Sequence, residues 1–313
     1  MRTAFIQALN EMADRDERVC LIVGDLGYSV IEDFANRHPD QFVNAGVSEQ
    51  NMIGLAAGMA MTGKIVFTYS IGNFGTLRCL EQIRNDVCYH RANVKVVAVG
   101  GGLAYGNLGV THHASEDVAI MRSLPNMTVV APGDPAEARL ATRAVVALDG
   151  PAYLRLGKAG EPVVHEKDPE LVLGRAITVR DGSDVTLIAS GGMLATANKV
   201  TSTLAGQGLG VRLLSMHTVK PLDKDAVTRA ATETRYVFTL EEHSVEGGLG
   251  GAVAEVMAEL EPGSAPLRRI GLRPEFNKTV GDQNYLKAMH GLDEESVLKT
   301  IQQIITRSYG RVG

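Results

Sequence analysis

The sequence has few cysteines, no excess of basic residues and no long hydrophobic run. Its three cysteines, Cys20, Cys79 and Cys88, are odd in number and lack metal-ligand spacing. We therefore expect free or buried thiols in a reducing compartment, without a disulfide framework. The formal net charge of -5 argues against a nucleic-acid partner, which would leave a basic footprint. Because no uncharged apolar stretch reaches the length of a bilayer span, a membrane segment is not expected either.

The N-terminal segment lacks the pattern of a secretory signal. Glu11, Asp14, Asp16 and Glu17 fall where a signal peptide would be apolar. With 313 residues, of which 45% are hydrophobic, the chain can bury a substantial core, and its length predicts two domains. We therefore expect a cytoplasmic enzyme that acts on small molecules, with no membrane or nucleic-acid partner.

Short apolar runs alternate with helical stretches through the first half of the chain. Continuous apolar strands joined by helices imply a parallel sheet with helices on both faces. The predicted strands are Val19–Val23, Lys64–Tyr69, Val94–Val99 and Met127–Ala131, and the predicted helices cover 51–62, 77–90, 116–123 and 135–148.

A polar stretch, Glu161–Gly174, interrupts this pattern. A second, smaller α/β set follows it. We therefore expect a first domain over 1–165, a linker over 166–182 and a second domain over 183–313. The predicted strands of the second set are Val185–Ser190, Val211–Ser215, Tyr236–Glu241 and Leu267–Gly271.

The segment Ala45–Met52 places one carboxylate, Glu49, at the start of an apolar helix. A carboxyl group in such surroundings is suited to proton transfer near neutral pH. The alternative is an ordinary helix start, where the dipole and the free backbone N–H groups favour Glu. On this segment alone, the alternative is favoured.

The Glu49 segment resembles the cofactor-activating stretch of transketolases, a Gly-x-x-Glu-(His/Gln) motif followed by a Gly/Ala-rich helix. The chain as a whole resembles the C-terminal half of a transketolase, encoded as a separate subunit. The resemblance implies a thiamine diphosphate-binding pyrimidine domain followed by a smaller α/β transketolase C-terminal domain. It also rests on Val23–Leu26, Leu80–Asn85, Thr111–Asp117, Met121–Met127, Ala131–Asp134, Pro151–Arg155 and Lys220–Asp223, in family order and spacing.

The resemblance implies roles for residues around the cofactor's pyrimidine ring. The 4′-amino group of thiamine diphosphate removes the C2 proton once a carboxyl group binds N1′, and Glu49 matches that carboxyl. Ile71, Phe74 and Leu77, spaced by three, match the positions whose side chains pack against the ring. These side chains are usually aromatic in the family, but only Phe74 is aromatic here, so we expect an apolar slot with less aromatic stacking on the ring. Asp25, at the end of a predicted strand, matches a residue near the cofactor and the subunit contact. For Asp25, a turn or helix-cap role is equally compatible.

Two glycine-rich segments are interpreted differently. His112 follows the loop Gly100–Gly109 and matches a family histidine that moves protons on substrate hydroxyls, whereas we expect His113 to be structural. The run Gly247–Gly251 precedes a predicted helix and could cradle a dinucleotide phosphate. It falls in the part that resembles the C-terminal domain, so we favour a packing role.

Five further residues match the family's substrate-binding positions. Arg2, Ser29 and Arg155 match residues that hold a sugar phosphate, a task for which arginine provides bidentate, charge-assisted hydrogen bonds. The alternatives are a disordered terminus for Arg2 and a surface strand end for Arg155. Gly100 and Leu108 replace a histidine and an aspartate of the family. These changes predict an altered donor site, with open space beside Gly100.

The family's Mg²⁺-binding stretch, Gly-Asp-Gly…Asn, is missing. Leu148–Gly150 and Pro132–Pro135 contain parts of it but lack the Asn. We therefore expect no metal ligand on this chain. The resemblance implies that an N-terminal-type transketolase subunit supplies the diphosphate and Mg²⁺ sites, in an α2β2 heterotetramer.

The expected function is transfer of a two-carbon ketol unit between sugar (phosphate) substrates through a thiamine diphosphate ylide. One alternative is decarboxylative chemistry on the same cofactor, as in deoxyxylulose phosphate synthase or the β subunit of a 2-oxo acid dehydrogenase. An alternative of another class is a non-catalytic scaffold that retains the fold, against which intact Glu49 and His112 argue.

Overall fold

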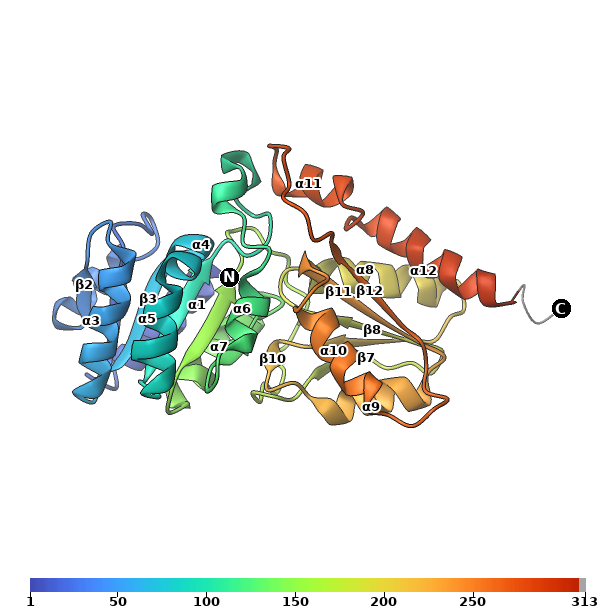
Figure 1. Cartoon of the computed structure of the whole chain (residues 1–313), viewed down its shortest axis with the longest axis horizontal. Helices are drawn as coiled ribbons and strands as arrows, with labels where there is room; N and C mark the ends of the chain where they lie inside the picture. The colour runs from blue at the N-terminus through green and yellow to red at the C-terminus, as the bar shows by residue number, and fades with distance from the viewer. Residues whose placement is uncertain (310–313) are drawn as a thin grey trace.

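The computed structural model describes residues 1–309, which form two α/β halves built on separate sheets (Figure 1). The first sheet has the order β10-β5-β6-β4-β3-β1-β2. Its strands from the first half are all parallel, which confirms the predicted parallel sheet. They are β1 (Val19–Val23), β2 (Phe42–Asn44), β3 (Ile65–Ile71), β4 (Val94–Val99), β5 (Thr128–Val130) and β6 (Ala152–Leu156).

Helices cover both faces of this sheet. On one face, α1 (Arg2–Ala13) and α7 (Pro135–Ala147) pack in one apolar cluster with strand residues such as Phe67. The start of α7 follows from its sequence, because the Asp134 side chain accepts a hydrogen bond from the Glu137 backbone and Pro135 is pre-set for the first turn. The opposite face carries α3 (Glu49–Met61), α6 (Asp117–Ser123) and a π-helical segment, η3 (Ile83–Tyr89).

The helix expected over 77–90 is broken into shorter pieces. The chain leaves β3 through α4 (Gly72–Gly75), a 3₁₀ turn (Leu77–Cys79) and α5 (Leu80–Gln82) before η3. Thr76 separates α4 from this run of helical pieces; its hydroxyl donates to the Gly72 carbonyl, and its φ and ψ are -118° and -77°. π-helical segments occur frequently at functional sites. The first half also contains α2 (Glu32–Arg37).

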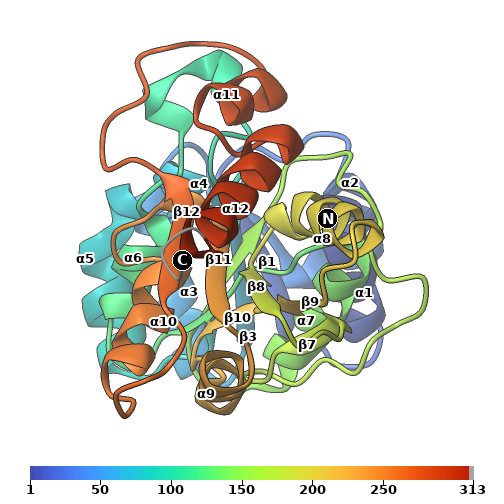
Figure 2. The ribbon, with the colours of Figure 1, turned by 90° about the vertical axis from the view of Figure 1, so that its right-hand side faces the viewer.

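The second sheet has the order β12-β11-β8-β9-β7 (Figure 2). Two apolar clusters lie against it, one with α8 and α12 and the other with α9 and α10. Among the described residues, no helix is long and apolar enough to cross a bilayer. The elements are β7 (Ile177–Arg180), β8 (Val185–Ala189), α8 (Met193–Gly206), β9 (Val211–Ser215), α9 (Lys224–Glu233), β11 (Tyr236–Ser244), α10 (Leu249–Ala258), β12 (Leu267–Leu272), α11 (Gln283–Met289) and α12 (Glu294–Tyr309).

Two short strands differ from the expected division of the chain. Strand β7 lies inside the expected linker 166–182, but it pairs antiparallel with β9 and belongs to the second sheet. Strand β10 (Thr218–Lys220) follows β9 in sequence yet pairs antiparallel with β5, at the edge of the first sheet. Lys220 fixes this crossing, since its ammonium group donates to the carbonyl of Arg122 at 2.9 Å and to that of Leu124. The two halves are therefore interlocked.

Lys95 is a charged residue within the otherwise apolar strand β4 of the first sheet. It is fully buried, and its ammonium group donates to the carbonyls of Leu148 and Gly150 at 2.7 and 2.5 Å. Burial lowers the pKa of Lys95 to about 7, although Asp149 opposes that shift.

This pKa predicts a pH dependence of stability. Between about pH 7 and pH 10.4, the unfolded chain would keep a proton on Lys95 that the folded chain has lost, so unfolding takes up a proton and stability rises with pH. Replacing Lys95→Met removes this proton. The unfolding free energy of the wild type minus that of the variant, measured in urea titrations, should then increase from pH 7 to pH 10. A pH-independent difference would contradict the assignment.

Candidate functional site

The loops that follow the parallel strands of the first sheet meet at the carboxyl ends of those strands, where α/β proteins place their sites. Glu49 begins α3 at this end of the sheet and is only 4% exposed. A Cβ atom on Gly24, directly after β1, would lie 3.6 Å from Glu49 Cγ. The Glu49 carboxylate is therefore enclosed beside the end of β1.

Glu49 forms an ion pair with Arg78. The Arg78 guanidinium lies 2.8 Å from Glu49 Oε2 and 4.7 Å from the centroid of the Phe74 ring. Burial, reinforced by Glu49, raises the pKa of the neighbouring Cys79 thiol to about 12, which excludes a reactive thiolate there. The sequence analysis missed Arg78, because a single arginine within an apolar stretch gives no signal of its own.

His112 also contacts Phe74. The two rings meet edge to face with their centroids 4.9 Å apart, and the Tyr105 ring is 6.2 Å from the imidazole. Burial lowers the pKa of His112, so the ring is mainly neutral at pH 7 and can accept a proton. Contacts therefore run from Glu49 through Arg78 and Phe74 to His112.

The expected apolar slot is only partly assembled. Ile71 ends β3 and Phe74 lies within α4, close after it, while Leu77 begins the next turn and is 37% exposed. Of these three residues, Phe74 alone makes ring contacts with both Arg78 and His112. The role of all three in packing against a pyrimidine ring stays a prediction.

Asp25 and Ser29 lie in a tight, exposed turn after β1. Both adopt positive φ, 55° and 65°, which is uncommon for residues other than glycine. Asp25 and Asn44 exchange two hydrogen bonds, and the Ser29 N–H donates to Glu32. These local bonds explain the turn, and the cofactor and phosphate roles of the two residues stay predictions.

The expected open space beside Gly100 is absent. Gly100 has a φ of 84°, and a Cβ atom there would lie 2.1 Å from the Tyr105 ring. Lys158 lies 4.9 Å from the centroid of the same ring. Burial raises the pKa of Tyr105, and the positive charge of Arg2 opposes this shift. The Tyr105 ring thus fills the space beside Gly100, close to the cations Arg2 and Lys158. Leu108, in the turn that follows, is 55% exposed.

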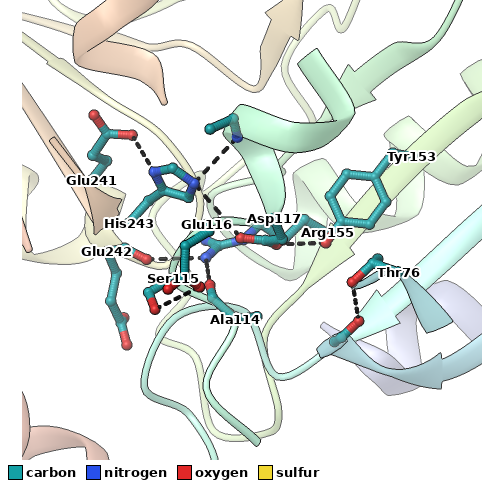
Figure 3. A network of polar contacts seen from close by, with 12 residues as sticks. Thr76, Ala114, Ser115, Glu116, Asp117, Tyr153, Arg155, Glu241, Glu242 and His243 are labelled. Atoms are coloured by element: carbon teal, nitrogen blue, oxygen red, sulfur yellow. Dashed lines mark hydrogen bonds and ion pairs between the residues drawn. The ribbon is translucent and has the colours of Figure 1, made fainter. Parts of the chain in front are cut away.

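Arg155 is bonded to buried groups of the protein itself, and its expected role as a phosphate ligand stays a prediction. It is 8% exposed, so it is not a surface strand end. Its Nε donates to Asp117 at 2.8 Å, and its Nη2 donates to the carbonyls of Ala114 and Glu242 at 2.8 and 3.0 Å (Figure 3). The exposed cation at this strand end is Lys158, which the sequence analysis missed because it gives no pattern of its own.

The remaining histidine and glycine expectations agree with the structure. His113 is 3% exposed, and its carbonyl accepts a hydrogen bond from Asn73, which fits a structural role. At the Gly247–Gly251 run, the Glu241 carboxylate accepts from the first N–H groups of α10 at 2.7 Å and occupies the place a phosphate would need. A Cβ atom on Gly248 would lie 2.1 Å from that carboxylate, as the packing role requires.

Comparisons with known proteins support the family. Residues 1–160 match the transketolase pyrimidine-binding domain, and residues 174–297 match the transketolase C-terminal domain. This chain belongs to the transketolase family. It is 39% identical over 308 residues to an apulose-4-phosphate transketolase subunit of Phocaeicola vulgatus (98% of this chain, 97% of that protein). It is 40% identical over 308 residues to a 6-deoxy-6-sulfo-D-fructose transketolase subunit of a Clostridium species (98% and 95%).

A solved structure shows the same architecture. The protein described as "split gene transketolase, inactive beta4 tetramer" superposes with a TM-score of 0.88 at 37% identity and covers 97% of each chain. Members of the transketolase family use thiamine diphosphate. The enclosed carboxylate of Glu49 and the adjacent Phe74 ring fit an aminopyrimidine. Among the described residues, no group of three or more His, Cys, Asp or Glu side chains could hold a metal.

The different settings of Arg155 and Lys158 predict different effects on stability. Arg155→Met leaves Asp117 buried without its cation, which should cost about 3–5 kcal/mol of unfolding free energy. Lys158→Met, the matched control, changes an exposed residue and should stay within about 0.5 kcal/mol. Urea unfolding measures both. Equal stabilities for the two variants would contradict the buried role of Arg155.

Proposed function

We propose that this chain is the C-terminal-type subunit of a two-chain transketolase, which transfers a two-carbon ketol unit between anionic sugars with thiamine diphosphate. The observation that carries the proposal is the line of contacts from the enclosed Glu49 through Arg78 and Phe74 to His112. This line of contacts connects a carboxyl group suited to proton transfer with a neutral histidine at the carboxyl ends of the strands.

Glu49 would hold N1′ of the aminopyrimidine and move a proton at that nitrogen, with Phe74 packed against the ring. When bound, thiamine diphosphate supplies a carbon nucleophile at C2. Arg78 pairs with Oε2 of Glu49, so Oε1 is the oxygen that would bond with N1′. His112, kept neutral by burial, would take a proton from a substrate hydroxyl.

The substrate anion would bind at the cations around Tyr105. Lys158 lies 4.9 Å from the centroid of this ring, and the charge of Arg2 acts on the Tyr105 hydroxyl. The two curated relatives are named for a sugar phosphate and a sulfonated sugar, both of which carry an anionic group. We therefore assign the anion to Arg2 and Lys158, with Ser29 at the same end of the sheet, in place of Arg155.

The diphosphate and Mg²⁺ would be held by an N-terminal-type transketolase subunit in a cytoplasmic α2β2 heterotetramer. Two findings support a partner: both curated relatives are named as subunits, and the solved relative is described as an inactive β4 tetramer. The three free, buried cysteines fit a reducing compartment.

Glu49→Gln tests the proton role. The amide keeps the shape of the side chain but cannot support the proton shift at N1′, so turnover by the two-chain complex should fall by about 10²-fold or more. Hydrogen–deuterium exchange at C2 of the cofactor, followed by NMR, should slow in parallel. The isolated chain should show neither exchange nor turnover. Unchanged exchange in the variant complex would make Glu49 an ordinary helix-start residue.

Leu108 and Tyr105 predict the choice of donor. Burying a donor hydroxyl against Leu108 without a partner costs about 1–3 kcal/mol, roughly a 5- to 150-fold handicap. Because Tyr105 fills the space beside Gly100, the favoured donor should be less hydroxylated rather than bulkier. Leu108→Asp should improve kcat/KM for xylulose 5-phosphate relative to deoxy ketoses. The measurement is kcat/KM for a panel of donors that includes pyruvate. Carbon dioxide release from pyruvate would instead identify a decarboxylating carboligase.

A further inference from the structure

The loop that carries His112 is held at its base by the second half of the protein. Its two ends meet at a reciprocal pair of backbone hydrogen bonds between Gly102 and Ala114, each 2.9 Å long. Between them, the chain makes two 3₁₀ turns, Gly106–Leu108 and Val110–His112. The position of the imidazole therefore depends on what fixes the Gly102–Ala114 pair.

Glu242, on β11 of the second half, contacts one end of the loop directly. Its Oε1 accepts a hydrogen bond from the Leu103 N–H at 2.8 Å, and the side chain is 4% exposed. A Cβ atom on Gly102 would lie 2.6 Å from Glu242 Cγ, so only glycine permits this approach. From α11, Gln283 donates to both carboxylate oxygens at 2.9 Å, and Lys287 lies 3.1 Å from Oε2.

Arg155 ties the other end of the loop to the same residue. One nitrogen, Nη2, donates to the carbonyl of Ala114 and to the backbone carbonyl of Glu242 (Figure 3). Two residues further along β11, the Ser244 N–H donates to the Ser115 carbonyl at 2.8 Å. Both ends of the loop are therefore bonded to β11, one through the Glu242 side chain and the other through its main chain.

We propose that Glu242 is a positioning residue that sets the place of His112 in the active site, so that the C-terminal domain contributes to catalysis through the loop. The proposal rests on the proposed function, because His112 matters only if it faces the reacting substrate. Glu242 also lines a cavity beside Arg155, but its carboxylate is already bonded to Leu103, Gln283 and Lys287, so it would act through the loop 100–114. A displacement of about 1 Å is enough to cost on the order of 10²-fold in rate.

The test compares Glu242→Ala with Glu241→Ala in the two-chain complex. Glu241 is the neighbouring residue, equally buried, but its carboxylate binds the start of α10 rather than the loop. Both variants should lose thermal stability. Only Glu242→Ala should lower kcat, roughly 10- to 10²-fold, and speed amide hydrogen exchange within residues 100–114. Cofactor C2 exchange depends on Glu49, so it should stay unchanged.

A conservative variant keeps the test informative if the alanine variant fails to fold. Glu242→Gln retains an oxygen that can accept from Leu103, so it should recover much of the lost kcat and slow the amide exchange again. Unaltered kcat and unaltered amide exchange in Glu242→Ala would overturn this inference alone. Absence of C2 exchange in the unaltered complex would instead overturn the proposed function, and the inference with it.

Discussion

The buried ion pair between Asp117 and Arg155 is the interaction on which the arrangement of the two halves depends. Asp117 is fully buried, and its Oδ2 accepts hydrogen bonds from Arg155 at 2.8 Å and from the Tyr153 hydroxyl at 2.5 Å. Burial alone would raise the pKa of Asp117, but Arg155 holds it below its ordinary value. Hydrogen bonds to the remaining groups of a buried pair add to its stability. Arg155 makes two such bonds, whereas Oδ1 of Asp117 accepts none from the described residues.

The partners that complete this pair come from both halves of the chain. Ala114 belongs to the histidine loop, whereas Glu242 belongs to β11. His243 adds a further contact between the halves, since its Nε2 accepts from the Ala119 N–H at 3.3 Å and its Nδ1 lies 2.7 Å from the Ser244 carbonyl. The charged pair therefore orients the two sheets as well as the loop between them.

The fold could be predicted from the sequence where the pattern is regular. Strands β1, β4 and β8 lie where the predominantly apolar runs of the sequence predicted them. Strands β2, β6, β7 and β10 were not predicted. Strands β2, β7 and β10 are short and lie at sheet edges, whereas β6 lies within the first sheet but carries Arg155 in its short apolar run. Such tertiary context overrides local propensity.

The site could be predicted only in part, for a related reason. A resemblance between sequences assigns residues to positions but does not show which groups a side chain already contacts. Arg155 is committed to buried partners, and the space beside Gly100 is taken by Tyr105 from five residues further along. The contacts of Arg78 and Glu242 cross 29 and 139 positions of sequence, so no local pattern could indicate them.

The crossing of β10 into the first sheet has a consequence for how this protein can be divided. A polypeptide cut after the first half would lack β10 and leave β5 as an uncovered edge, and uncovered edges promote pairing between molecules. Chimeras that exchange C-terminal domains between relatives would have to match Thr218–Lys220 to the recipient's β5. The second half is thus a structural complement of the first rather than a detachable module.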